Sequence, residues 1–224
     1  MENQNENTRG WPSLSYALLA FACLGIELLL AFAAEPLIFG RPMNEWSDLQ
    51  NIIHWVLTCV CWGLVIIFLI RTADSKLGYN VLARGSRMKP WQWAVIAVLF
   101  VLMLVYSWFD WNGSKVIKEF RYNGWLKFIF QYIYYAFEVG LVLLIISFGQ
   151  KAFENWFHQG SAVLIPYGGI LAGLTWGLAH AFTKGSLVTG LALLAVSVFY
   201  GLTWLLTNRD FSKAYPVIFL MFVL

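Results

Sequence analysis

Charged residues are scarce in this sequence. Asp, Glu, Lys and Arg make up 12% of its 224 residues, whereas 60% of the residues are hydrophobic. A soluble domain carries about a quarter charged residues, because these side chains must cover its surface. The stretches 155–183 and 185–208 contain none of the four, and each is long enough to cross a bilayer core, which takes about 20 apolar residues. The sequence therefore excludes a soluble protein and predicts an integral membrane protein.

Cysteine is also scarce. Cys23, Cys59 and Cys61 all lie in apolar segments without C-x-x-C spacing, so they predict small hydrophobic side chains and no disulfide framework. The net charge of +3 is small, and no nucleic-acid partner is expected. Membrane lipid is the partner that this composition predicts.

Six apolar runs, separated by polar residues, are long enough to span a membrane. They are 14–34, 52–70, 91–109, 128–148, 162–182 and 187–206. A seventh run, 214–224, is too short to cross, so it is a half-span, an interfacial segment or a helix cut short at the chain end. The prediction is an all-α fold, a polytopic transmembrane helix bundle that forms a single domain over residues 1–224.

Lys and Arg are unevenly divided between the two ends of this predicted bundle. The N-terminus and the even-numbered loops carry nine of the 15 basic residues, and the opposite side carries six. Cytoplasmic loops are enriched in Lys and Arg. We therefore expect a multi-pass protein of the plasma membrane with its N-terminus in the cytoplasm.

Ionisable side chains inside a span are the best guide to function, because each costs roughly 2.5 to 3.5 kcal/mol on insertion. Three stand out: Glu27, Glu138 and His180. For Glu27 a structural or snorkelling role is expected, since few polar residues share its face. His54 and His158 lie at span ends or in loops and are interpreted as interfacial residues outside the site.

Glu138 lies midway along the 128–148 run. Gln131, Tyr134 and Tyr135 precede it by seven, four and three residues, which places all four side chains on one helix face. This polar stripe predicts a cavity inside the bundle, with Glu138 as a carboxylate that exchanges protons with water.

His180 is expected to face into the bundle. Gly169, Gly173 and Gly177 repeat at intervals of four along its side of the helix, a spacing that allows another helix to approach closely. Trp176 lies one turn before His180 and is predicted to share the cavity. A buried His beside a buried Glu would activate water, and an equally open alternative is that both only form hydrogen bonds between helices.

The last predicted span carries a further stripe at helical spacing, formed by Ser197, Tyr200, Gly201, Trp204 and Asn208. Asn208 is the last residue of this stripe. We expect it to line the same cavity.

Two segments resemble the CAAX prenyl protease and bacteriocin-processing (CPBP) family of intramembrane proteins. They are A-F-E-V-G-L-V-L at 136–143 and G-L-T-W-G-L-A-H at 173–180, within a similar region of about residues 126–224. The family motifs read E-E-x-x-x-R and F-x-x-x-H. The resemblance implies that Glu138 is a general base and His180 its partner, with Trp176 in place of Phe, and it allows for a divalent metal.

The chain departs from the family pattern at three positions. Val139 replaces the second Glu, Leu143 replaces the Arg, and Met221 occupies the position of the third-motif His. The resemblance therefore implies a slow endopeptidase acting on peptides or prenylated peptides. The alternatives are a non-catalytic scaffold or immunity-type protein that binds a membrane protein partner, and, third, a small transporter.

Overall fold

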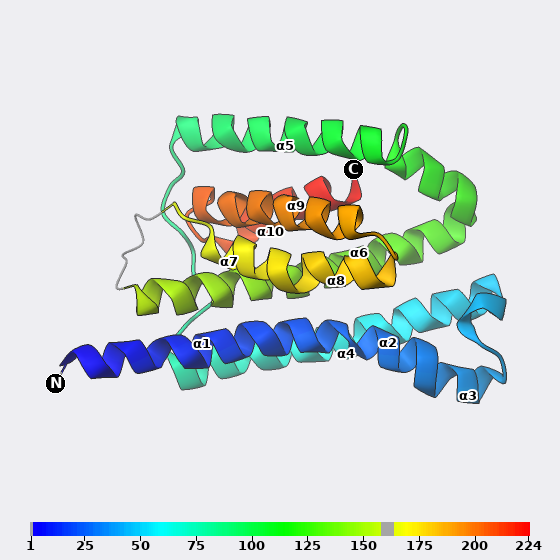
Figure 1. Ribbon diagram of the computed structural model, residues 1–224, viewed down its shortest axis with the longest axis horizontal. Coiled ribbons are helices and arrows are strands. Elements are labelled where there is room, and N and C mark those ends of the chain that lie inside the picture. The colour runs from blue at the N-terminus through cyan, green and yellow to red at the C-terminus, as the bar shows by residue number, and fades with distance from the viewer. Residues whose placement is uncertain (1, 158–163) are drawn as a thin grey trace.

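The computed structural model describes residues 2–157 and 164–224. Over these residues every regular element is a helix, as predicted. Figure 1 shows the long helices side by side with roughly parallel axes, so they form one elongated bundle. Within the described ranges, five helical segments are long and apolar enough to cross a membrane: Gly10–Phe39, Asp48–Leu77, Pro90–Asp110, Lys115–Trp156 and Leu187–Leu206. The predicted multi-pass helical fold is thus confirmed.

The first half of the chain forms a pair of long helices, α1 and α4, that pack against each other, and the separate helix α5. Its elements are α1 (Glu2–Leu24), α2 (Ile26–Leu29), the π-helical turn η1 (Leu30–Ala34), α3 (Glu35–Phe39), the 3-10 turn η2 (Met43–Glu45), α4 (Asp48–Leu77) and α5 (Pro90–Asp110). Ser47 and Gln50 form a capping box at the start of α4. This cap ends the loop after α3 and returns the chain into the bundle.

The second half of the chain supplies the central helix and the layer beside it. Its elements are α6 (Lys115–Trp156), α7 (Tyr167–Ala172), the π-helical turn η3 (Gly173–Gly177), α8 (Leu178–Thr183), α9 (Leu187–Leu206) and α10 (Phe211–Val223). In α6 every residue from 138 to 150 is buried. This helix packs against α1 and α4 on one side and against α7 and α10 on another.

Helix α6 consists of two helical parts. Gly124 adopts φ 67° and ψ 174°, a conformation that glycine tolerates at least cost. In Figure 1 the part before this break turns across the end of the bundle, and the part after it runs back between the other helices. The apolar run 128–148 predicts only the second part, and the charged residues before it predict a loop where the first part lies.

Among the described residues, the predicted 162–182 run forms a shorter helix than expected. The described helix there starts after Pro166, runs from Tyr167 to Thr183, and contains the π-helical turn. It is therefore not among the five helices that are long enough to cross. The short C-terminal run forms α10, a helix packed into the bundle with Ala214, Ile218 and Met221 buried.

The glycine repeat before His180 forms a close helix contact with α9, as predicted. A Cβ added at Gly169 would lie 2.8 Å from the Cα of Gly201 and 2.6 Å from the carbonyl oxygen of Ser197. Gly173 and Gly177 approach the backbone of α9 in the same way. The face that bears these glycines is thereby fixed against a neighbouring helix.

Candidate functional site

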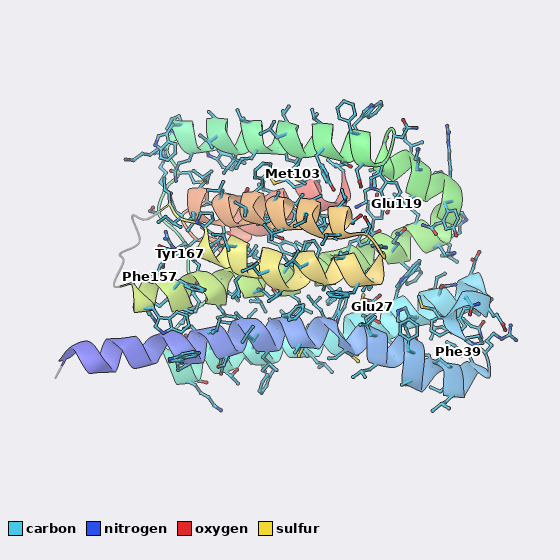
Figure 2. All side chains as sticks on the ribbon, viewed as in Figure 1. Glu27, Phe39, Met103, Glu119, Phe157 and Tyr167 are labelled. Carbon is cyan, nitrogen blue, oxygen red and sulfur yellow. The ribbon has the colours of Figure 1, made fainter. Side chains whose placement is uncertain are left out.

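A cavity of about 710 Å³ lies within the half of the bundle that contains the α8–α9 connection. Side chains from α1, α2, α4, α5, α6, α8, α9 and α10 line it, together with η3. Figure 2 labels two of them, Glu27 beside α2 and Met103 beside α5, at opposite sides of the central helices. The predicted residues that line this cavity are Glu138, His180, Gln131, Tyr134, Tyr135 and Trp176.

Glu138 is held by the indole of Trp176. The Nε1–H group of Trp176 donates a 2.9 Å hydrogen bond to Oε1 of Glu138. The Glu138 residue is 8% exposed, and its small accessible surface faces the cavity. A phenylalanine at position 176 would have no such donor, so the tryptophan fixes the orientation of the carboxylate.

His180 is held by the backbone of the same tryptophan. Its Nδ1 lies 2.8 Å from the carbonyl oxygen of Trp176. A carbonyl only accepts hydrogen bonds, so Nδ1 carries a proton and the Nε2 atom of the neutral ring keeps its lone pair. The imidazole also packs edge-on against the indole, with 4.8 Å between ring centroids. Trp176 therefore positions both groups, and no contact between the described atoms joins Glu138 directly to His180.

Gln131 and Tyr135 serve a different carboxylate from the one expected. Both donate to Glu119, at 3.3 Å and 2.7 Å, and Tyr132 donates to the other oxygen of Glu119 at 3.0 Å. The carboxylate is buried, with 4% of the residue exposed. Sequence reasoning missed Glu119, because it lies in the first part of α6, which was taken as a loop.

Lys115 brings a positive charge to the cavity wall. Its Nζ donates a 2.7 Å hydrogen bond to the carbonyl oxygen of Phe222. It also lies 5.0 Å and 4.9 Å from the ring centroids of Tyr135 and Phe222, within the range of a cation–π contact. Carboxylate, imidazole and ammonium groups therefore share one largely aromatic chamber.

A second group of titratable residues extends from this cavity. Nδ1 of His54 lies 2.6 Å from Oε2 of Glu35, and its Nε2 lies 3.9 Å from Oε1 of Glu27. His54 is 1% exposed and Glu35 is fully buried. The interpretation of His54 as an interfacial residue is thus wrong, because the turn after α3 folds Glu35 against it.

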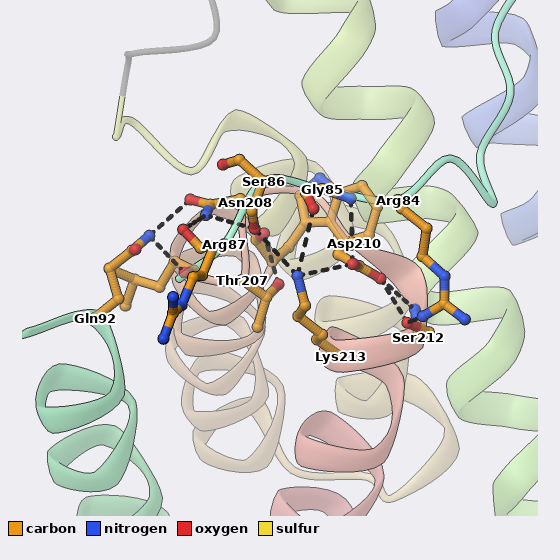
Figure 3. A network of polar contacts seen from close by, with 12 residues as sticks. Arg84, Gly85, Ser86, Arg87, Gln92, Thr207, Asn208, Asp210, Ser212 and Lys213 are labelled. Carbon is orange, nitrogen blue, oxygen red and sulfur yellow. Dashed lines mark hydrogen bonds and ion pairs between the residues drawn. The ribbon is translucent and has the colours of Figure 1, made fainter. Parts of the chain in front are cut away.

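The expected placement of Asn208 in the cavity is also wrong. Asn208 lies in the connection between α9 and α10 with φ 56°, so the helix that would have carried it towards the cavity has already ended. Its amide donates to the carbonyl of Ser86 and accepts from Gln92 at 2.7 Å. Figure 3 shows this polar network, in which Asn208 and Asp210 bind the loop before α5 to the turn before α10.

His158 and Met221 are two further residues for which the sequence predicts a position. His158 lies outside the described residues. Met221, which the resemblance aligns with the third-motif His of the CPBP family, lines the cavity with its thioether 3.8 Å from the hydroxyl of Thr203. Within the described ranges, no three His, Cys, Asp or Glu side chains are arranged to hold a metal ion, so the residues present do not fit the divalent metal that the resemblance allows.

Comparison with protein families, with characterised proteins and with solved structures finds no match to this chain. The resemblance to the CPBP family therefore stays a prediction based on the two short segments.

Proposed function

We propose that this protein is a CPBP-like intramembrane endopeptidase with Glu138 and His180 as its catalytic pair. One observation carries the proposal: the two side chains come from different helices, line the same cavity, and are both oriented by Trp176. Interhelical hydrogen bonding alone does not account for an imidazole Nε2 and a carboxylate that both border an open chamber.

The chemistry follows from the orientation of the two groups. Glu138 accepts a proton from a water molecule through the carboxylate edge that Trp176 leaves free, and the resulting hydroxide attacks the peptide carbonyl. The His180 Nε2 lone pair accepts a hydrogen bond from the same water and aligns it. The proton on Glu138 then passes to the amine that leaves, so the carboxylate is regenerated.

The walls of the cavity suit an apolar peptide segment or a prenylated peptide. Trp55, Trp62, Tyr134 and Tyr200 line it, and aromatic rings bury large apolar groups while placing a few polar atoms. Met221 supplies no hydrogen-bond donor where the family has an imidazole. Loss of one oxyanion donor costs about 100-fold to 1000-fold in rate, so slow turnover is expected.

The proposal includes the cellular setting. Several spans support a multi-pass protein. The excess of basic residues on the side of the bundle that carries the N-terminus supports a plasma-membrane protein with a cytoplasmic N-terminus. In that orientation the catalytic chamber lies in the half of the membrane away from the cytoplasm. A cysteine at exposed Asp74 should react with a membrane-impermeant thiol reagent only after the cells are opened.

Cleavage of a library of fluorogenic peptides, with and without a prenyl group, tests the activity. The purified wild type in lipid nanodiscs should release product, whereas Glu138→Gln and His180→Asn should lose at least about 100-fold of the rate. Asp74→Asn is the matched control, because Asp74 is exposed and remote from the cavity. Equal rates for wild type and Glu138→Gln would refute the proposal.

A second candidate is a non-catalytic protein that binds a membrane partner or an apolar peptide. The observation in its favour is the Glu138 carboxylate already bonded to Trp176, with Met221 in place of a donor. Binding of the same peptides without cleavage, unaffected by Glu138→Gln, would establish this function instead. Ion-dependent uptake into liposomes would favour the transporter alternative.

A further inference from the structure

Glu27, His54 and Glu35 lie close together, and an irregular helical turn separates the two glutamates in the sequence. Glu27 and Glu35 are eight residues apart, and in a regular α-helix that spacing rotates the side chains about 80° away from each other. The π-helical turn Leu30–Ala34 lies between them. It absorbs one extra residue, so the rotation becomes about 700°, or roughly 20° from two full turns. Both carboxylates therefore face His54.

The inner pair of this group is buried beyond the reach of bulk water. His54 is 1% exposed and Glu35 is 0% exposed, with 2.6 Å between Nδ1 and Oε2. Trp46 covers the imidazole at a ring-centroid distance of 5.5 Å. Burial of two charges is costly unless their remaining polar atoms are also paired.

Those remaining atoms are not paired. Oε1 of Glu35 and Nε2 of His54 are buried and have no hydrogen-bond partner among the described atoms. An unmet buried polar atom destabilises the fold, and a purely structural pair gains nothing from leaving two of them. A pair that accepts and releases protons needs such open positions.

Glu27 connects the pair to the cavity. Its Oε1 lies 3.9 Å from Nε2 of His54, a gap that a small side-chain rotation closes, and its side chain is 30% exposed. On α6, Tyr134 and Glu138 line the same cavity as Glu27. At the start of α4, Asp48 is already paired with Lys127 at 2.9 Å. Glu27, His54 and Glu35 thus form a continuous chain of contacts from the cavity to a buried carboxylate.

We propose that Glu27, His54 and Glu35 form a proton-binding relay that opens into the cavity. Glu27 takes a proton from cavity water and passes it to Nε2 of His54, while the proton on Nδ1 moves to Oε2 of Glu35. One proton enters and one is stored: Glu27 returns to its carboxylate, the imidazole stays neutral with its proton on Nε2, and Glu35 becomes a carboxylic acid. The relay is independent of peptide cleavage, because it uses neither Glu138 nor His180.

Infrared difference spectroscopy of the full chain in lipid nanodiscs tests the relay. After a rapid drop from neutral to acid pH, the wild type should gain carboxylic-acid bands as the relay takes up a proton. Glu35→Gln should remove one of these bands. A relay sets the rate of proton uptake and not its equilibrium, so in Glu27→Gln the Glu35 band should appear at least about 10-fold more slowly, although the His54–Glu35 pair stays intact. Glu138→Gln is the matched control and should leave the Glu35 band in place.

The variant His54→Gln separates a relay from a structural pair. Its Glu35 band should appear at least about 10-fold more slowly than in the wild type, while Glu27, which faces the cavity, still responds at the wild-type rate. If His54→Gln does not fold, Glu27→Gln alone decides the matter, because it changes a partly exposed side chain. A wild-type spectrum without a Glu35 band, or a Glu35 band that appears in Glu27→Gln as fast as in the wild type, would overturn the proposal.

Discussion

The indole nitrogen of Trp176 lies 2.9 Å from the carboxylate of Glu138, and this bond joins η3 to the central helix α6. The backbone carbonyl of the same residue accepts a hydrogen bond from Nδ1 of His180. One residue therefore sets the orientation of both candidate catalytic groups, Glu138 through its side chain and His180 through its backbone. Its effect is separable by mutation, because phenylalanine keeps the ring but removes the donor.

Trp176→Phe should leave a buried carboxylate oxygen without a partner. The expected destabilisation is about 1–3 kcal/mol, together with slower peptide cleavage if the proposed function holds. Thermal unfolding in detergent measures the first effect. Trp62→Phe is the control for the loss of an indole hydrogen bond that does not hold a carboxylate, since it removes a 3.0 Å bond to the backbone carbonyl of Cys23. Unchanged unfolding of Trp176→Phe would show that the bond contributes nothing to stability.

Gly169→Ala should disrupt the contact between α7 and α9. The added Cβ would lie 2.6 Å from the carbonyl oxygen of Ser197 and 2.8 Å from Gly201, and backbone atoms cannot rotate away. Overpacking of this kind costs about 1–3 kcal/mol. Gly63→Ala is the matched control, because its Cβ would meet only the ring of Phe137 at 3.0 Å. Equal melting temperatures of the two variants would contradict the prediction.

The sequence predicted Glu138 and His180 because both interrupt long apolar runs, where a polar side chain is conspicuous. Glu35, His54 and Glu119 escaped attention for the opposite reason. They lie at or beyond the ends of the apolar runs, where charged side chains ordinarily reach water. They are buried only because other segments of the folded chain pack over them. Burial of this kind is a tertiary property that no local pattern contains.

Asn208 shows the limit of periodicity. The helical spacing from Ser197 onwards is real and places Tyr200 in the cavity wall, but α9 ends at Leu206. Asn208 and Arg209 then adopt φ angles of 56° and 58°, so the chain reverses and the Asn208 side chain meets the loop before α5. Asn tolerates this left-handed conformation better than most residues, a signal that identifies it as a turn residue.

Asp210 should stabilise the fold in a pH-dependent way. Burial opposes ionisation, but hydrogen bonds from Ser212, Lys213 and the Gly85 amide outweigh it and lower the pKa of Asp210 to about 2. An unfolded Asp has a pKa of about 3.9. A depressed folded value adds stability above the unfolded pKa, and this stability is lost as pH falls from about 4 through about 2.

Asp210→Asn should therefore melt at a lower temperature than the wild type near neutral pH, with a gap that closes towards about pH 2. Thermal unfolding across that range measures the gap. Asp48→Asn is the control, because its pair with Lys127 is exposed and worth about 0–1 kcal/mol. A gap that stays constant down to about pH 2 would show that ionised Asp210 is not the source.

Met221→His tests whether the cavity lacks only a donor. Met221 lies in the cavity wall with 2% of its surface exposed, and the hydroxyl of Thr203 is close enough to orient an imidazole there. Under the proposed function, a new donor near the developing oxyanion should raise the cleavage rate by about 10-fold or more, part of what a complete donor supplies. Met103→His, also in the cavity wall but on α5, should give no gain. If the two variants change cleavage equally, a general change in cavity polarity explains the effect and the specific role of position 221 is refuted.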